Sequence, residues 1–180
     1  MTWPIRATRT AYENRWIRVL EDQIVKPDGG TGIYGVVEMQ HTAVFVVAVT
    51  EADEVLLVTI DRHTVGRSVE VPAGSTDGED PLVAARRELL EETGYEAAEW
   101  RKIGRMNALN GIARAPEHIY LATGLAPSAH AGESQAEEGI SDVRAVPWPE
   151  VTRMIEAGEI TDGETVAALM FAAVALGRVS

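Results

Sequence analysis

The chain has 180 residues, a hydrophobic fraction of 46% and a formal net charge of −12, which is enough for one domain with a sizeable core. The acidity argues against a nucleic-acid surface or an anionic membrane as partner, and the absence of cysteine excludes disulfides, zinc thiolates and thiol catalysis. A phosphorylated substrate would be repelled unless metal cations intervened. Without the apolar core of a signal peptide or an apolar run of about 20 residues, we expect a cytoplasmic protein.

The first half of the chain predicts mainly strands. Short strands flank the turn-rich stretch 26–32, so residues 1–40 predict a small sheet of their own. Two runs rich in β-branched residues, 42–49 and 54–60, are typical of strands buried on both faces. A further strand at the start of 68–80 ends in a glycine-rich loop.

A helix is predicted to follow this loop. Asp80 is a good N-cap, Pro81 suits the first helical position, and Gly94 is typical of the residue that ends a helix. We therefore expect a helix from Pro81 to Thr93. Its predicted buried stripe consists of Leu82, Ala85 and Leu89.

The second half of the chain predicts a mixture of strands and helices. Long loops in compact domains are often functional, and the polar, small-residue-rich stretch 126–142 is such a loop. The whole pattern indicates an α/β sandwich with a mixed sheet. The remaining expected elements are strands near 99–106, 117–125 and 143–148, an irregular loop at 107–116, and helices at 149–159 and 162–178.

Three carboxylates gather at the C-terminal end of the predicted helix. Glu88, Glu91 and Glu92 share one face, and like charges at this spacing cost about 0.2–0.5 kcal/mol per pair. They also lie at the negative end of the helix dipole, where basic residues are favoured. Two interpretations remain open: a solvated acidic face, or a site where divalent cations neutralise the cluster.

The wider stretch 72–95, PAGSTDGEDPLVAARRELLEETGY, resembles the Nudix box G-x5-E-x7-R-E-U-x-E-E-x-G-U, in which U is a bulky apolar residue. From Glu79 onward the match is complete. Upstream it departs, because four residues separate Gly74 from Glu79 where the motif has five. The resemblance implies a Nudix-type α/β/α sandwich with a mixed central sheet and a small N-terminal antiparallel sheet.

The resemblance also implies roles for the residues of the box. Glu88 and Glu92 are expected to bind two or more Mg²⁺ or Mn²⁺ ions, Glu91 to act as ligand or base, and the Ala73 carbonyl to complete the coordination. Mg²⁺ prefers oxygen ligands of this kind and often shares them with substrate phosphates. Arg87 either orients Glu91 or forms only a surface salt bridge. Glu79 either supports the loop or is merely exposed.

Flanking segments resemble the ADP-ribose pyrophosphatase branch of the family. The lead-in VEVPAG at 69–74, the segment 61–67 and the helix entry at 158–172 carry this likeness. It places Arg62, and more weakly Arg67, at the substrate together with Gly74. It also implies an N-terminal β subdomain (1–40), exchanged between subunits of a homodimer, before a Nudix hydrolase domain (41–180).

The branch draws its general base from a late loop, which makes Glu138 or Glu137 candidates, with Glu133 less favoured, unless these acids are simply solvated. Glu117 either faces the metals or lies at an exposed edge. The expected activity is hydrolysis of the pyrophosphate bond in a nucleoside diphosphate linked to another moiety, foremost ADP-ribose to AMP and ribose 5-phosphate. The alternatives are another nucleoside-diphosphate sugar or a dinucleotide as substrate, or a non-catalytic nucleotide-sensing module.

Overall fold

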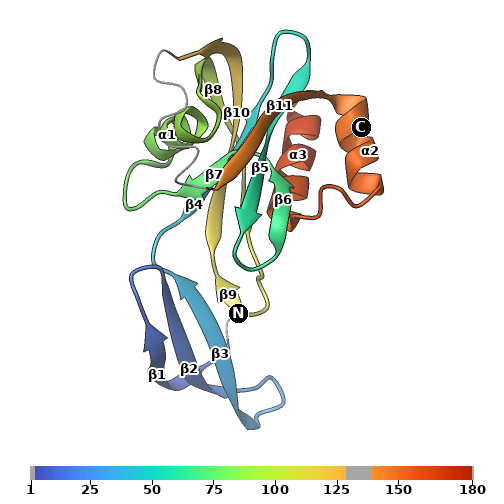
Figure 1. The fold of residues 1–180 in the computed structure, drawn as a ribbon. Coiled ribbons are helices and arrows are strands. Elements are labelled where there is room, and N and C mark those ends of the chain that lie inside the picture. Colours follow the sequence, from blue (N-terminus) through green and yellow to red (C-terminus); the bar gives the residue numbers. More distant parts are fainter. Residues whose placement is uncertain (1–2, 129–138, 180) are drawn as a thin grey trace.

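The computed structural model describes residues 3–128 and 139–179. A small sheet formed mainly by the N-terminal strands projects from one end of the body (Figure 1). Its strand order is β1-β2-β3-β9, with β1, β2 and β3 antiparallel and β9 parallel to β3. The predicted N-terminal antiparallel sheet is thus confirmed. Its strands are β1 (Ile5–Glu13), β2 (Ile17–Val25), β3 (Thr31–Met39) and β9 (Ala113–Arg114).

Two further sheets form the body of the molecule. The order β7-β4-β10-β8 defines a mixed sheet, because β4 and β10 run parallel while the other pairs are antiparallel. The order β11-β5-β6 defines a separate antiparallel sheet beside it. The strands are β4 (Ala43–Ala48), β5 (Glu54–Arg62), β6 (Gly66–Glu70), β7 (Ala73–Ser75), β8 (Tyr95–Asn107), β10 (Pro116–Pro127) and β11 (Ile140–Pro147).

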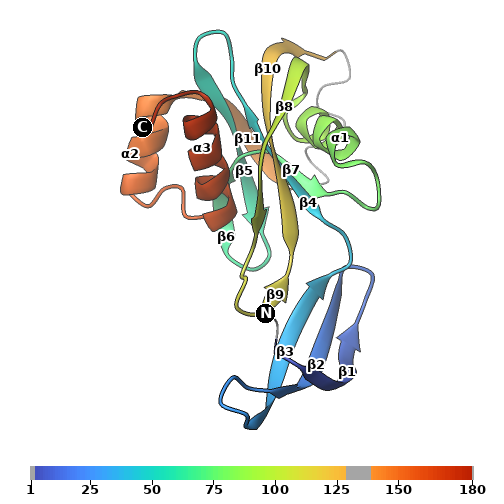
Figure 2. The same cartoon turned by 180° about the vertical axis from the view of Figure 1, so that it is seen from behind.

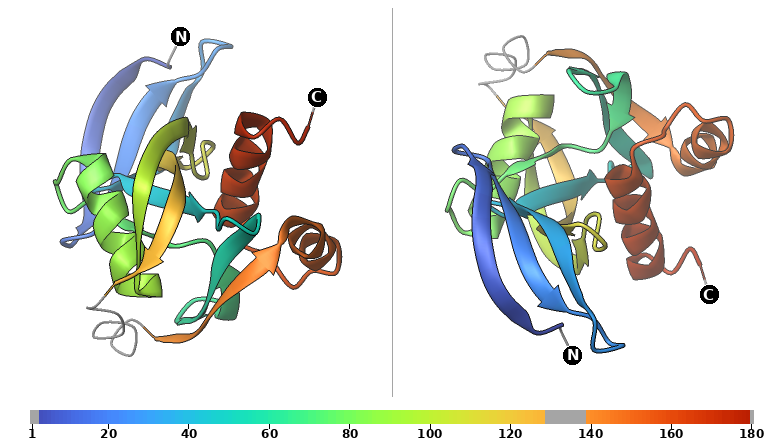
Figure 3. Two further views of the ribbon diagram at one scale, coloured as in Figure 1. Left: turned by 90° about the horizontal axis from the view of Figure 1, so that it is seen from above. Right: turned by 90° about the horizontal axis from the view of Figure 1, so that it is seen from below.

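Helices cover both sides of these sheets, which confirms the predicted α/β/α sandwich. The helix α1 (Pro81–Thr93) lies on one side, and α2 (Trp148–Glu156) and α3 (Gly163–Ala175) lie on the other (Figures 2 and 3). Within the residues described, no helix is long and apolar enough to cross a bilayer.

The strand β4 is buried on both faces and joins the two halves of the core. Val44 and Val46 pack with Leu89 of α1, whereas Phe45 and Val47 belong to the cluster on the α2 and α3 side. An alternating strand with one polar face could not do this, so the continuous apolar run in the sequence is explained by burial on both sides.

The bounds of α1 agree with the prediction because its caps are local. The Asp80 carboxylate accepts from the Leu82 N–H at 2.9 Å. Gly94 has a left-handed φ of 74° and its N–H donates to the Leu90 carbonyl at 2.8 Å. Ala85 and Leu89 are fully buried, but Leu82 is only half-buried and Ala84 completes the stripe instead.

Candidate active site

The site begins at the C-terminal half of α1, where two of the three clustered glutamates are buried. Glu88 is 6% exposed and Glu92 is 3% exposed, whereas the Glu91 side chain is 32% exposed. The interpretation as a solvated acidic face is therefore wrong for Glu88 and Glu92. Both side chains face β7 because α1 packs on that strand. The sequence around the helix could not reveal this packing.

Arg87 holds the loop and the helix together at this point. Its Nη1 donates to Glu88 at 2.8 Å and to Glu91 at 3.0 Å, and its Nε donates to Glu79 at 3.2 Å. Its Nη2 donates to the Ser75 carbonyl at 2.9 Å. Burial disfavours the charge of Arg87, but Glu88, Glu91 and Glu79 together raise the pKa of its guanidinium. Arg87 is thus a structural centre of the site and more than a surface salt bridge.

The strand β7 approaches the helix closely because it carries a glycine. A Cβ at Gly74 would lie 2.2 Å from Cδ of Glu88, so any other residue would displace this carboxylate. The neighbouring Ala73 N–H donates to Glu92 Oε2 at 2.9 Å. Both buried carboxylates are therefore positioned by the backbone of β7 as well as by their own helix.

The shortened loop between Gly74 and Glu79 still delivers Glu79 to Arg87. The Glu79 N–H donates to the Thr76 carbonyl at 2.8 Å, and Asp77 and Gly78 take positive φ values of 48° and 88°. A tight turn therefore absorbs the missing residue, and the expected support of the loop by Glu79 has a geometric basis.

The chemistry of the donor set fits a hard divalent cation. Glu88, Glu91 and Glu92 offer only carboxylate oxygens, which suit Mg²⁺ or Mn²⁺, and Gly74 leaves the space that Glu88 occupies. Across residues 3–128 and 139–179, no three Asp, Glu or His side chains already converge as a ligand set. The carboxylates of Glu88 and Glu91 instead both accept from the Arg87 guanidinium, which supplies positive charge here.

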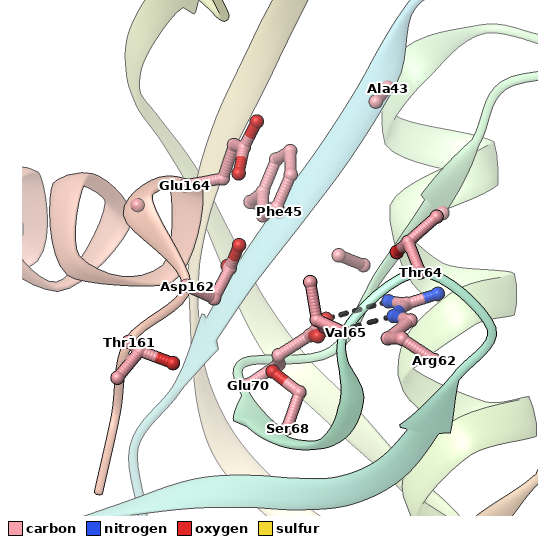
Figure 4. Close-up of a pocket in the computed structure, with 13 residues that line it drawn as sticks. Ala43, Phe45, Arg62, Thr64, Val65, Ser68, Glu70, Thr161, Asp162 and Glu164 are labelled. Atoms are coloured by element: carbon pink, nitrogen blue, oxygen red, sulfur yellow. Dashed lines mark hydrogen bonds and ion pairs between the residues drawn. The ribbon is translucent and has the colours of Figure 1, made fainter. Parts of the chain in front are cut away.

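A polar cavity of about 420 Å³ extends from β7 between β4, β6 and the start of α3 (Figure 4). Arg62 lies in it and forms a two-pronged ion pair with Glu70, with Nε–Oε1 and Nη2–Oε2 distances of 3.1 and 2.6 Å. The hydrogen bonds to Glu70 raise the pKa of Arg62. The second predicted arginine, Arg67, is exposed on β6 and does not line this cavity, whereas Gly74 does.

A smaller cavity of about 220 Å³ adjoins it and contains Glu117. This residue is 5% exposed, so the interpretation as an exposed edge residue is wrong. Burial, followed by the charges of Glu164 and Asp162, raises its pKa to about 7. The sequence did not identify Glu164 and Asp162 as site residues, because the local sequence DGET does not indicate that they lie near the strand that carries Glu117. The predicted bases Glu137 and Glu138, with Glu133, lie outside the described residues.

Comparisons with known proteins agree with this arrangement. A model described as NUDIX domain matches residues 39–169, and one described as Nucleoside diphosphate sugar hydrolase N-terminal domain matches residues 3–37. The "ADP-ribose pyrophosphatase" of Mycobacterium tuberculosis is 32% identical over 171 residues, covering 91% of this chain and 80% of that protein. The "Methanol dehydrogenase activator" of Bacillus methanolicus is 31% identical over 166 residues, covering 91% and 89%.

Two other similarities bear on the substrate and the fold. The "GDP-mannose pyrophosphatase" of Escherichia coli is 36% identical over 113 residues, covering 62% of this chain and 59% of that protein. A solved structure described as "ADP compounds hydrolase" has a TM-score of 0.82 at 22% identity, covers 99% of this chain and 98% of its own, and supports the fold.

Fold, site and relatives together define an enzyme of the pyrophosphohydrolase class. More particularly, the chain belongs to the Nudix family, and it is related to ADP-ribose and GDP-mannose pyrophosphatases.

Proposed function

We propose that this chain hydrolyses the pyrophosphate bond of a nucleoside diphosphate linked to a second moiety, with ADP-ribose as substrate and AMP and ribose 5-phosphate as products. The observation that carries the proposal is the burial of Glu88 and Glu92 against β7, beside a cavity that holds Arg62. Relatives named as ADP-ribose pyrophosphatases support the choice of substrate.

The residues of α1 and β7 are proposed to hold two or more Mg²⁺ or Mn²⁺ ions. Glu88, Glu91, Glu92 and the carbonyl of Ala73 are the proposed ligands. Such ions polarise a phosphoryl oxygen, lower the pKa of bound water and stabilise the leaving oxygen. They would also offset the negative charge that the chain presents to a diphosphate.

The protein's own groups are proposed to orient the substrate and move one proton. Arg62 faces the diphosphate from the cavity wall, Arg87 keeps Glu91 in place, and Gly74 lets Glu88 approach the substrate side. A glutamate accepts the proton of the attacking water, whose oxygen is transferred to one phosphorus while the other phosphate leaves. Glu91 is one candidate for this base, and Glu138 and Glu137 are the others.

Phosphatase-coupled release of phosphate from ADP-ribose with Mg²⁺ tests the activity. In the Glu88→Gln and Glu92→Gln variants we expect kcat/KM to fall by about 100-fold or more, since even groups that only support metal ligands contribute about 10–100-fold. Glu156→Gln is the matched control, because Glu156 is exposed on α2. Full activity in both site variants, or equal Mg²⁺ binding by calorimetry in a triple Glu→Gln variant, would refute the proposed metal site.

The relatives also support a second candidate within the same chemistry. The GDP-mannose pyrophosphatase match favours another nucleoside-diphosphate sugar as substrate. The match to a protein named as an activator favours a different alternative, a non-catalytic nucleotide-sensing role. A panel of nucleoside-diphosphate compounds ranked by kcat/KM separates these functions, because a sensor would bind the compounds without releasing phosphate.

We further propose a homodimer formed through the N-terminal sheet, with a cytoplasmic location. All nine residues of the edge strand β1 are exposed, Tyr12 among them, and the large side chain of Trp3 just before the strand is exposed as well. An exposed sheet edge of this kind favours pairing with another chain. Light scattering measures the molecular mass of the full chain and of the chain without residues 1–40. It tests the dimer and the proposed division into 1–40 and 41–180. Cell fractionation tests the location.

A further inference from the structure

Glu164 connects the two cavities of the site. It lies in the first turn of α3 and lines both the cavity of about 420 Å³ and the smaller one of about 220 Å³, and Ala43 is also shared by both. Figure 4 shows the Glu164 carboxylate beside Phe45, across the larger cavity from the ion pair of Arg62 and Glu70. Glu164 therefore lies where the two cavities adjoin, whereas Glu117 lines only the smaller one.

Glu117 supplies independent evidence that something binds here. Its Oε2 is completely buried and has no hydrogen-bond partner among the residues described. Buried polar atoms are nearly always hydrogen-bonded, because leaving one unpaired is costly. Since the Glu117 side chain lines the smaller cavity, the hydroxyl of a ligand bound there can donate a hydrogen bond to its carboxyl group.

The charge of the cavity walls is negative. Among the described residues that line the larger cavity, Arg62 is the only basic side chain, and it forms a two-pronged ion pair with Glu70. Asp162 and Glu164 remain, and Asp162 also accepts from the Thr165 N–H at 2.7 Å as the cap of α3. Apart from Arg62, the proposed contact of the diphosphate, the described residues of the wall therefore offer acceptors for hydroxyl groups and no second basic side chain for a further anionic group.

The neighbouring acids also affect one another. Burial, followed by a hydrogen bond with Asp162 and its charge, raises the pKa of Glu164. After burial, the charge of Glu164 is the next cause that raises the pKa of Glu117. A further negative group brought between them would add repulsion, whereas the hydroxyl groups of a neutral sugar would donate hydrogen bonds that compensate for the desolvation of the carboxyl groups.

We propose that Glu164 and Glu117 select substrates by the charge of the second moiety, so that an uncharged, hydroxyl-bearing sugar is accepted and a sugar carrying a carboxylate or phosphate is rejected. This inference rests on the proposed hydrolysis of nucleoside-diphosphate compounds and adds the class of the group beyond the diphosphate. Glu164 contributes the charge and Glu117 the hydrogen-bond acceptor.

Two substrate pairs whose second moiety differs by an anionic group provide the test: ADP-ribose with ADP-ribose 1″-phosphate, and UDP-glucose with UDP-glucuronate. In the wild-type protein we expect kcat/KM to favour the neutral member by about tenfold or more, as like charges discriminate strongly at close range. In Glu164→Gln the preference should fall by at least about fivefold, mainly because the anionic member gains activity.

The control is Glu159→Gln. It removes an exposed acid that lies four residues before α3, pairs with Arg153 and lines neither cavity. Its preference should equal that of the wild type, and melting temperatures confirm folding of both variants. No preference in the wild type, or an unchanged preference in Glu164→Gln, would overturn the inference.

Calorimetric binding of the same four compounds separates this inference from the proposed function. If the wild-type protein binds neutral compounds more tightly but releases no product, the proposed hydrolysis fails and the charge selection stands. If it hydrolyses both members of each pair equally well, the hydrolysis stands and the charge selection fails. A Glu164→Gln effect that follows the nucleobase instead of the sugar would also reject it, since the cavity would then hold the nucleoside.

Discussion

Glutamates on α1 and on β10 differ in how their charge is compensated. Glu88 and Glu92 receive hydrogen bonds from Arg87 and from the backbone N–H of Ala73. Glu117, also buried, has an oxygen without a partner among the described residues, and its neighbour Glu164 adds repulsion. Protein donors hold Glu88 and Glu92 in place, whereas a bound ligand could supply the missing hydrogen-bond donor for Glu117.

The comparison teaches that burial of acids can serve two purposes in one site. A carboxylate fixed by donors keeps its geometry, which suits coordination of a cation. A carboxyl group without a donor gains from any ligand that supplies one, which suits recognition of a hydroxyl group. The predictions below test this distinction, from the largest expected effect to the smallest.

The largest effect is expected from Gly74→Ala. The new Cβ would lie 2.2 Å from the end of the Glu88 side chain, which can rotate away at modest cost in stability. The carboxylate would then leave its position, so we expect kcat/KM for ADP-ribose to fall by about 100-fold with only a small change in melting temperature. Gly35→Ala is the control, because a Cβ at this position would have no contact within 4 Å. Wild-type turnover in Gly74→Ala would show that Glu88 need not stay where it is.

Arg87→Lys should have the next largest effect. An ammonium cannot reproduce the planar fork that contacts Glu79, Glu88, Glu91 and the Ser75 carbonyl. We expect kcat to fall by about 10–100-fold, together with a lower melting temperature. The matched control is Arg86→Lys, one residue earlier and exposed. Equal losses in both variants would mean that Arg87 acts only through helix stability.

Glu117→Gln should change how stability depends on pH. Folding raises the pKa of Glu117 to about 7 from its ordinary value of 4.5, so between these pH values the folded protein binds more protons than the unfolded chain. Stability from this group is therefore lost as pH rises from about 4.5 to 7. Urea unfolding measures this. Between pH 5 and pH 8, we expect the free energy of unfolding of the variant to rise relative to that of the wild type by on the order of 1 kcal/mol.

The control for this pH effect is Glu99→Gln, since Glu99 is exposed on β8. It should shift stability equally at both pH values. A constant difference between Glu117→Gln and the wild type across this range would contradict the unsatisfied state of Glu117.

The smallest effect is expected from Asp80→Ala, which removes the cap of α1. The hydrogen bond to the Leu82 N–H would be lost, at a cost of about 1 kcal/mol in the free energy of unfolding. The buried glutamates lie at the other end of the helix, so kcat/KM should change little. Thermal and urea unfolding measure the loss; a large fall in activity without it would mean that Asp80 contacts the substrate.

Much of the fold could be predicted from sequence because its signals are local. The caps at Asp80 and Gly94 define α1, and the apolar run of β4 identifies a strand buried on both faces. The split into a mixed sheet and a separate three-stranded sheet could not be predicted, because strand partners are chosen by packing between distant segments. The relevant pairs, such as β5 with β11, are far apart in the chain.

By itself, the sequence determined the carboxylate-bearing helix, its register and the pairing of Arg87 with Glu91, because all of these follow from the 3.6-residue helical repeat. Only the tertiary structure decided that Glu88 and Glu92 are buried against β7, and that Glu117 of β10 and Glu164 of α3 line the same cavity. The physical reason is that burial, and with it the pKa of an acid, depends on what packs across the sheet, and no local repeat encodes that.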